Sequence, residues 1–280
     1  MENHAVMPTT NRSLKARIAR HGVYQRLRGS RVYDAYWRVM DRGILDARAR
    51  EVDFYQTLLG PVQRGAVMFD IGANHGAKTD VFLRLGATVV AVDPDESNYN
   101  VLRGRFLAYR LFKRPVAIIN KAVSDRVTVE TMWVDAPGSA KNTLSRKWVD
   151  TLRDDADRFG HRLDFAFQRE VETVTLESLI DEHGLPYFIK IDVEGFEPQV
   201  VSGLRRPVPF LSYEVNLPEF RTEGLACVDM LHRVAGSGLF NYAADCAQGL
   251  ALPQWLNASD FAQALRTCTE PSIEVFWRTV

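Results

Sequence analysis

Acidic side chains recur beside turns and strand ends in this sequence, at positions where they could contact a ligand. In the stretch MFDIGANHG, Asp70 stands directly before a turn that holds Gly72 and Gly76. Asp93 follows the next apolar run, and Asp192 ends the run FIKID. Carboxylates of this kind can attract a cationic ligand, accept hydrogen bonds from hydroxyl groups or take up a proton.

The turn after Asp70 distinguishes between two kinds of nucleotide ligand. It departs from the dinucleotide pattern G-x-G-x-x-G, because Asn74 and Ala77 stand at the second and third glycine positions. In a dinucleotide site this turn faces a pyrophosphate at a helix N-terminus, and a buried acid at residue 70 would repel that group. The same carboxylate favours a ligand with a cationic amine and a sulfonium but no phosphate, which indicates S-adenosylmethionine (SAM). Asn74 can replace glycine because asparagine tolerates a positive φ.

Asp93 is expected at the carboxyl end of the second strand. An acid at this place accepts hydrogen bonds from ribose hydroxyl groups. NAD requires the same acid, so Asp93 indicates an adenosine ribose, while Asp70 indicates which cofactor carries it. The structural alternative is that both acids only cap the helices that follow them.

The stretch FIKIDVEGFEPQVVSGL supplies a further set of acids. A strand that ends in Asp192 places this carboxylate at the carboxyl edge of the sheet, where open α/β sheets bind ligands. Lys190 lies on the same face of the strand, so it can pair with Asp192 and still reach the cleft. For Lys190 and Glu197, an ordinary ion pair and a helix-dipole contact are equally good explanations.

These side chains require a fold that gathers strand ends, and the order of apolar segments predicts one. From residue 67 onward, short apolar runs alternate with amphipathic ones, which is typical of an α/β fold with a doubly wound, mostly parallel sheet. We expect the last strand to run antiparallel. Residues 125–175 break the alternation with two solvent-edged strands and a polar helix over 144–159, so we expect an insertion before the fourth strand. The expected strands are 67–71, 87–92, 116–123, 187–193, 210–215 and 273–277, and the expected helices are 77–85, 97–110, 176–183, 197–204 and 223–236.

Several of these motifs together resemble one family. Residues 65–215 are similar to the FkbM family of SAM-dependent methyltransferases, whose motif order and approximate spacing match FDIGANHG, AVDPDESN, NKAVSD, VTLESLI and IKIDVEGFEPQVVSGL. The element KIDVEG-x-E is the most specific to the family. The resemblance implies a class I, Rossmann-like methyltransferase sheet, SAM as the cofactor, and O-methylation of a hydroxyl on a sugar, a glycan or a secondary metabolite.

The resemblance also implies which residues line the SAM pocket. Ser124 and Asp125 are expected near the adenine, and Asp192 is expected to face the methionine end. His75 lies at a position that varies in the family. The full set of expected cofactor-binding residues is Asp70, Gly72, Ala73, Asn74, Gly76, Asp93, Pro94, Asn98, Ser124, Asp125 and Asp192.

Methylation of a hydroxyl gains from a general base within hydrogen-bonding reach, because a hydroxyl has a high pKa. The sequence leaves four candidates for this catalytic role: Asp192, Glu194, Glu214 and His75. Glu214 is equally well explained as a strand-end acid, and His75 as a helix-start residue. No H-x-H or H-x-x-E spacing indicates a dedicated metal site, so no metal ligands are predicted.

Two other classes of function compete with methyl transfer. An NAD-dependent oxidoreductase of nucleotide sugars would require a true G-x-G-x-x-G turn and a Tyr-x-x-x-Lys pair, and the sequence has neither. A non-catalytic nucleotide-binding module would keep the fold without the chemistry. The set of Asp70, Gly72, Gly76 and Asp93 argues against such a module, because an inactive site need not retain all four.

The N-terminal region differs in charge from the rest of the chain. Residues 11–50 contain eleven Arg and Lys against three Asp, although the whole chain has a net charge of zero. We expect residues 1–60 to form a basic helical extension or cap and residues 61–280 to form the SAM-dependent domain. The extension either packs on that domain or offers a surface to an anionic partner, such as an acidic acceptor or a membrane face. Nucleic acid is not expected, because no recognised nucleic-acid motif accompanies the charge.

Composition sets the remaining expectations. No apolar run approaches the length of a transmembrane helix, and the first 25 residues lack the apolar core of a secretory signal. The three widely spaced cysteines suit reduced thiols better than a disulfide framework. These features favour a cytoplasmic protein, and they leave its oligomeric state open.

Overall fold

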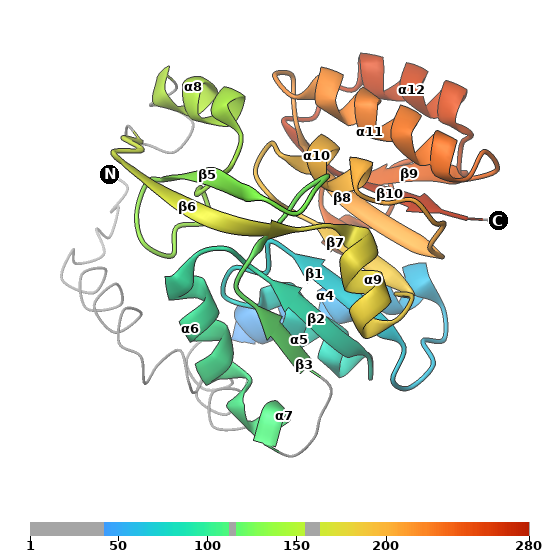
Figure 1. Ribbon diagram of the computed structural model, residues 1–280. Helices are drawn as coiled ribbons and strands as arrows, with labels where there is room; N and C mark the ends of the chain where they lie inside the picture. The colour runs from blue at the N-terminus through green and yellow to red at the C-terminus, as the bar shows by residue number, and fades with distance from the viewer. Residues whose placement is uncertain (1–41, 112–115, 155–162, 280) are drawn as a thin grey trace, which may run out of the picture.

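The computed structural model describes residues 42–111, 116–154 and 163–279, and its centre is a seven-stranded sheet (Figure 1). The strands lie in the order β3-β2-β1-β7-β8-β10-β9. The first five strands in this order pair in parallel, whereas β10 runs antiparallel to both of its neighbours. The predicted α/β class, the mostly parallel sheet and the antiparallel last strand are therefore confirmed. The strands are β1 (Val67–Ile71), β2 (Thr88–Val92), β3 (Val116–Ile119), β7 (Phe188–Ile191), β8 (Phe210–Asn216), β9 (Leu239–Ala243) and β10 (Ser272–Arg278).

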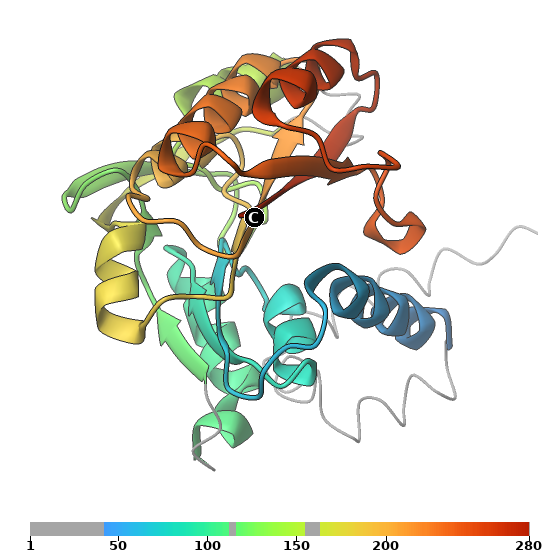
Figure 2. The same cartoon turned by 90° about the vertical axis from the view of Figure 1, so that its right-hand side faces the viewer.

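Helices cover both faces of this sheet, and each face has its own apolar core. One core is formed with the helices α4 (Arg42–Leu59), α5 (Ala77–Arg84), α6 (Glu96–Arg105) and the short α7 (Leu107–Leu111). The other is formed with α9 (Leu176–His183), α10 (Glu197–Ser202), α11 (Arg221–Val234) and α12 (Ala258–Thr267). Figure 2 shows α4 beside α5 on one side of the sheet and α11 with α12 on the other. Because both faces are covered, nearly all residues of β1 and β2 are buried, and apart from Asp70 and Thr88 both strands are apolar.

The segment between β3 and β7 forms a small second sheet over the carboxyl edge of the first. Its strands are β4 (Ala122–Val123), β5 (Val129–Val134) and β6 (Phe167–Val174), in the order β4-β6-β5. Helix α8 (Arg146–Asp154) lies between β5 and β6. The predicted insertion thus contains the two expected strands, and its described helix ends at Asp154, while Phe159 lies outside the described residues.

The structure departs from the predicted order of elements in several places. The expected third strand over 116–123 is two strands in different sheets, because the chain leaves the edge of the main sheet after Ile119 and pairs with β6 from Ala122. Strand β9 and helix α12 were not predicted. A start signal for α12 is present, since Asn257 accepts a hydrogen bond from the backbone N–H of Asp260 as an N-cap.

Helix α4 is the part of the predicted N-terminal extension that the structure describes. Its residues Tyr55 and Leu59 are buried in the core with Phe82 and Phe188, and Tyr55 also donates a hydrogen bond to Glu274 Oε1 at 3.1 Å. Most of the arginines of residues 11–50 lie outside the described residues. Within the described part of the chain, no helix has the length and apolar character needed to cross a membrane.

Phe188 in β7 tests the core on the α4 side. Its ring is fully buried and contacts the rings of Tyr55 and Phe82 at centroid distances of 5.7 and 5.4 Å. Phe188→Ala should lower the free energy of unfolding by about 3–5 kcal/mol, because it removes a large buried ring and leaves a cavity. Urea denaturation followed by circular dichroism would measure the loss. The same substitution at Phe167, which is 64% exposed, should change stability by less than about 0.5 kcal/mol; equal losses for the two variants would contradict the assigned core.

Candidate functional site

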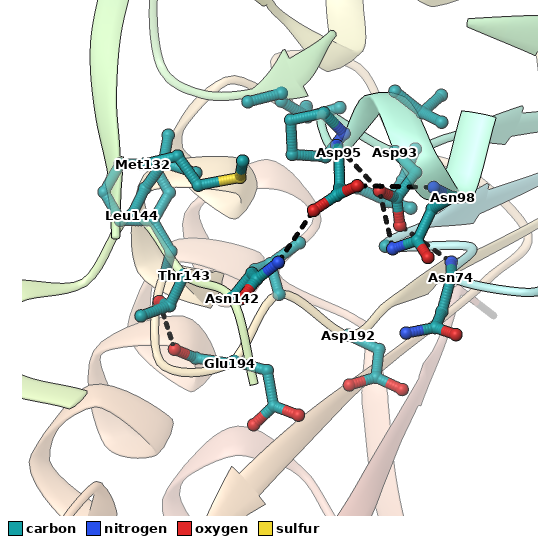
Figure 3. Close-up of a pocket in the computed structure, with 18 of the residues that line it drawn as sticks. Asn74, Asp93, Asp95, Asn98, Met132, Asn142, Thr143, Leu144, Asp192 and Glu194 are labelled. Atoms are coloured by element: carbon teal, nitrogen blue, oxygen red, sulfur yellow. Dashed lines mark hydrogen bonds between the residues drawn. The ribbon is translucent and has the colours of Figure 1, made fainter. Parts of the chain in front are cut away.

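A cavity of about 670 Å³, including its open mouth, lies at the carboxyl ends of β1, β2 and β7. This is the edge of an open parallel sheet at which ligands bind. The main sheet and the inserted segment both contribute to its walls (Figure 3). The residues of the sheet edge are Ile71, Gly72, Asn74, Val92, Asp93, Pro94, Asp95, Asn98, Asp192, Val193, Glu194 and Phe196, and those between β3 and α8 are Lys121, Ala122, Val123, Met132, Ser139, Ala140, Asn142, Thr143 and Leu144.

The turn after β1 has the backbone that its sequence predicts. Gly72, Asn74 and Gly76 all have positive φ, of 78°, 47° and 75°. A Cβ atom at residue 72 would lie only 1.8 Å from the carbonyl oxygen of Asp192, so glycine is required there by contact with the neighbouring strand as well as by its φ. Gly76 has a comparable constraint, because a Cβ would come within 2.5 Å of the Phe106 ring.

Asp93 ties this turn to the end of β2. Its Oδ2 accepts a hydrogen bond from the backbone N–H of Asn74 at 2.8 Å, and its Oδ1 accepts from the N–H of Asp95 and from Asn98 Nδ2 at 2.9 and 3.1 Å. Burial raises the pKa of Asp93 to about 6, although these three bonds favour the charged form. A carboxylate has about four acceptor positions, so Asp93 can accept at least one more hydrogen bond from a ligand.

Asn98 supplies a second free acceptor beside Asp93. Its Oδ1 is buried and accepts no hydrogen bond from any residue that the structure describes. Leaving a buried acceptor without a donor costs about 1–3 kcal/mol, so a hydroxyl or amine of a ligand would be stabilising here. Asp93 and Asn98 together therefore form a place for a group with two adjacent donors.

Asp95 holds the inserted segment over the cavity, a role that the sequence analysis missed. Its Oδ1 caps α6 by accepting from the N–H groups of Ser97 and Asn98. Its Oδ2 accepts from the N–H of Gly138 at 3.1 Å and from Asn142 Nδ2 at 2.8 Å. The position of an acid directly before a helix gives the N-cap signal, but nothing local indicates the contacts across to residues 138–142.

Several of the predicted cofactor-binding residues lie close to the cavity without lining it. Asp70 is almost completely buried, and Thr79 Oγ1 donates a hydrogen bond to its Oδ2 at 2.5 Å. Burial raises the pKa of Asp70, while the nearby Lys190 ammonium opposes the rise. Ala73, Gly76, Ser124 and Asp125 are also absent from the walls; in the segment of Ser124, it is Val123 that faces the cavity.

Three of the four predicted base candidates come together at the sheet edge. One carboxylate oxygen from each of Asp192, Glu194 and Glu214 lies within 4.8 Å of the others. Glu194 has a φ of +56°, and its carbonyl accepts a hydrogen bond from Thr143 Oγ1 at 2.7 Å. A non-glycine residue held in this region by a contact from another segment is typical of functional sites. The fourth candidate, His75, does not line the cavity.

The buried ammonium of Lys190 controls the charge of this acid cluster. Lys190 Nζ donates to Asp192 Oδ2 at 2.6 Å. Burial opposes ionisation of Asp192, but the ammonium outweighs it and lowers the pKa of this acid. Glu214 is affected in the opposite direction: burial and the negative charge of Asp192 raise its pKa to about 8. Burial and Asp192 likewise raise the pKa of Glu194. The cluster therefore combines an ionised acid with acids that hold protons at neutral pH.

Glu197 has a structural role at the start of α10. Its Oε1 accepts hydrogen bonds from the N–H groups of Val193 and Gly195, both at 3.2 Å. Burial raises its pKa to about 7, and these bonds oppose the rise. Glu197 therefore fixes the turn that carries Glu194. This agrees with the structural role at the start of the helix that the sequence allows for it.

Comparison with known proteins gives one match in sequence and several in structure. The sequence profile of the methyltransferase FkbM domain matches residues 70–234. No curated protein matches the chain.

Solved structures resemble the chain at low identity. A TehB-like SAM-dependent methyltransferase from Corynebacterium glutamicum is 9% identical, with a TM-score of 0.42 over 88% of this chain and 100% of that one. Precorrin-6y C5,15-methyltransferase from Geobacter metallireducens is 10% identical, with a TM-score of 0.39 over 83% and 88%. An O-methyltransferase from Bacillus cereus, in complex with S-adenosylhomocysteine (SAH), is 12% identical, with a TM-score of 0.35 over 84% and 81%. Likenesses of this size carry no argument about the site.

Asp93 can be tested through the affinity for SAH, the product form of the expected cofactor. Asp93→Ala should weaken SAH binding by about 1–3 kcal/mol, because it removes a charge-assisted hydrogen bond to the ligand and the support of the turn at Asn74. Isothermal titration calorimetry would measure the change. Glu96→Ala, at an exposed position in the first turn of α6, is the matched control and should leave the affinity unchanged. A folded Asp93→Ala protein with normal affinity would contradict this role.

Proposed function

This chain belongs to the FkbM family of SAM-dependent methyltransferases, and we propose that it methylates a hydroxyl group of a sugar, a glycan or a secondary metabolite. The family assignment favours methyl transfer over the NAD-dependent oxidoreductase and over a non-catalytic nucleotide-binding module. The observation that carries the choice of a hydroxyl is the cluster of Asp192, Glu194 and Glu214, whose carboxylate oxygens lie within 4.8 Å of one another. A hydroxyl needs a proton acceptor during methylation, and this cluster offers several.

The residues that line the cavity at the carboxyl ends of β1, β2 and β7, called the first cavity below, are compatible with SAM. The free Oδ1 of Asn98 and the remaining acceptor position of Asp93 suit the two hydroxyls of a ribose, which are adjacent donors. Asp192, which Lys190 keeps ionised, lines the same cavity and suits the cationic end of the cofactor. Apolar surface for the adenine of the cofactor comes from Pro94, Val123, Met132 and Leu144. Asp70 lies outside the cavity wall, so its negative charge would attract the cofactor without touching it.

When bound, SAM would supply an electrophilic methyl carbon to the acceptor oxygen, with its sulfur as the leaving group that keeps the electron pair. The protein's part is to align the acceptor and to take its proton. Asp192 and Glu214 divide this work. Lys190 keeps Asp192 ionised, so that it can hold the acceptor hydroxyl by a hydrogen bond. The deprotonated form of Glu214 takes the proton of the acceptor hydroxyl. With a pKa of about 8, this carboxylate is a stronger proton acceptor than an ordinary one.

We further propose that the acceptor is acidic or lies at a membrane face. The charge of residues 11–50 favours an acceptor with acidic groups, or one presented at a membrane face. Raising the ionic strength should then lower the rate of methyl transfer, because salt screens the attraction between residues 11–50 and the acceptor.

A pH profile tests the assigned base. Because burial and Asp192 raise the pKa of Glu214, its carboxylate becomes available only as pH increases, so kcat should rise as pH passes through about 8 and then level off. Transfer of radiolabelled methyl groups from SAM to a panel of hydroxyl compounds, including methyl glycosides and simple polyols, would give the profile.

The substitution Glu214→Gln should lower kcat by about 10²–10⁴-fold and remove the inflection near pH 8, while SAH affinity stays normal. Glu270→Gln, at an exposed position, is the control and should keep the profile. Methyl transfer to amines or carboxylates but to none of the hydroxyl compounds would overturn the proposal.

A further inference from the structure

A second cavity lies on the α4 side of the sheet, where β7 and β8 end and the antiparallel β10 begins. Its volume is about 550 Å³ including its mouth. Strands β7, β8 and β10 contribute Lys190, Glu214 and Glu274, and the segment after β9 contributes the rim. The complete lining is Lys78, Lys190, Asp192, Glu214, Ala243, Ala244, Cys246, Ser272, Ile273 and Glu274.

The two cavities meet at one residue. Of the residues that the structure describes, Asp192 is the only one that lines both. Glu194 lies on the side of the first cavity and Glu214 on the side of the second, and their carboxylates approach each other across Asp192. A methyl group that leaves a cofactor in the first cavity would therefore meet an acceptor in the second cavity at this acid cluster.

The polar groups of the second cavity are fixed by neighbours within the fold. Glu274 Oε1 accepts hydrogen bonds from Ser212 Oγ at 2.7 Å and from Tyr55 OH at 3.1 Å. Glu214 Oε1 accepts from Ser272 Oγ at 2.9 Å. Lys78, in the first turn of α5, pairs with Glu51 of α4. Side chains held in this way lose little conformational entropy when a ligand binds, so the cavity has the character of a preformed site.

The charges of the lining indicate the class of ligand. The lining holds two ammonium groups and three acids, so a charged group placed inside the cavity would face repulsion from part of the wall. No aromatic side chain belongs to the described lining, which disfavours a flat aromatic acceptor. Hydroxyl groups donate to carboxylates and accept from ammonium groups, so several hydroxyls on one compact molecule match this pattern.

We propose that the second cavity is the acceptor subsite, which binds a compact polyhydroxylated ring and presents one of its hydroxyls to Asp192 and Glu214. Lys78 and Glu274 then bind hydroxyls of the ring that do not react. This inference rests on the proposed O-methylation and assigns the place and the contacts of the acceptor.

Two exposed alanines allow the cavities to be blocked one at a time. Ala244 lies at the rim of the second cavity and Ala140 at the rim of the first, and both are exposed, so a tryptophan can be introduced without disturbing a core. Ala247 lies three residues after Ala244, in the short helix η1 (Cys246–Gln248); it is also exposed but lines neither cavity, so Ala247→Trp is the matched control.

Two binding measurements on the full chain separate the sites. Calorimetry measures the affinity for SAH. Saturation-transfer difference NMR on SAH-saturated protein measures binding of methyl α-D-glucopyranoside, methyl α-L-rhamnopyranoside and myo-inositol, with phenol as an aromatic comparison. The wild type should bind at least one of the three polyols in preference to phenol. Ala244→Trp should weaken that binding at least about tenfold and leave SAH affinity within about twofold, whereas Ala140→Trp should weaken SAH binding at least about tenfold.

Three results would overturn the inference. The first is a loss of SAH affinity in Ala244→Trp, which would mean that the second cavity holds the methionine end of the cofactor. The second is unchanged polyol binding in Ala244→Trp. The third is a wild type that binds phenol but none of the polyols. If the polyols bind as expected but methyl is transferred only to amines or carboxylates, the subsite stands and the proposed O-methylation fails.

Discussion

The ammonium group of Lys190 is the interaction on which the acid-rich edge of the sheet depends. It is buried beneath the junction of β1, β7 and β8 and donates to Asp192 at 2.6 Å. In spite of burial, the negative charges of Asp192, Glu274 and Asp70 raise its pKa, so it stays protonated. Without this charge, several carboxylates in one low-dielectric region would repel one another and would bind protons. Lys190 therefore lets the fold place acids of different protonation state side by side.

A second network joins the main sheet to the inserted segment. Asp93 fixes the turn after β1 and the start of α6, and Asp95 extends the same contacts to Gly138 and Asn142. Thr143 continues the connection to the carbonyl of Glu194. The inserted segment thus contacts both Asp95, the N-cap of α6, and the backbone of Glu194 after β7. By these contacts it fixes the position of Asp95 relative to the acid cluster.

The sequence predicts those parts of the site that depend on local pattern. Asp93 and Asp192 follow the largely apolar strands β2 and β7, and the carboxyl ends of parallel strands share one edge. Asn74 and Gly72 are required by the φ of a tight turn, which residue type alone indicates. Contacts between distant segments carry no such signal. Nothing in the sequence near Asp95 or Tyr55 indicates that one binds residues 138–142 and the other Glu274. Asp70 differs from both cases: the sequence predicts a buried acid beside the turn, but not that it lies outside the cavity wall.

The contact between Gly72 and the carbonyl of Asp192 makes the turn and the acid-bearing strand one unit. The two residues are far apart in the sequence, yet there is no space between their backbones for a single methyl group. Either segment exchanged alone with that of a relative would bring a slightly different backbone curvature into a contact with no tolerance. Recombination between homologues should therefore succeed only when both segments come from the same parent. The unit that must be exchanged as a whole is then β1 with its turn together with β7 and the acids after it. The strand–turn–helix unit at the beginning of the fold is not sufficient by itself.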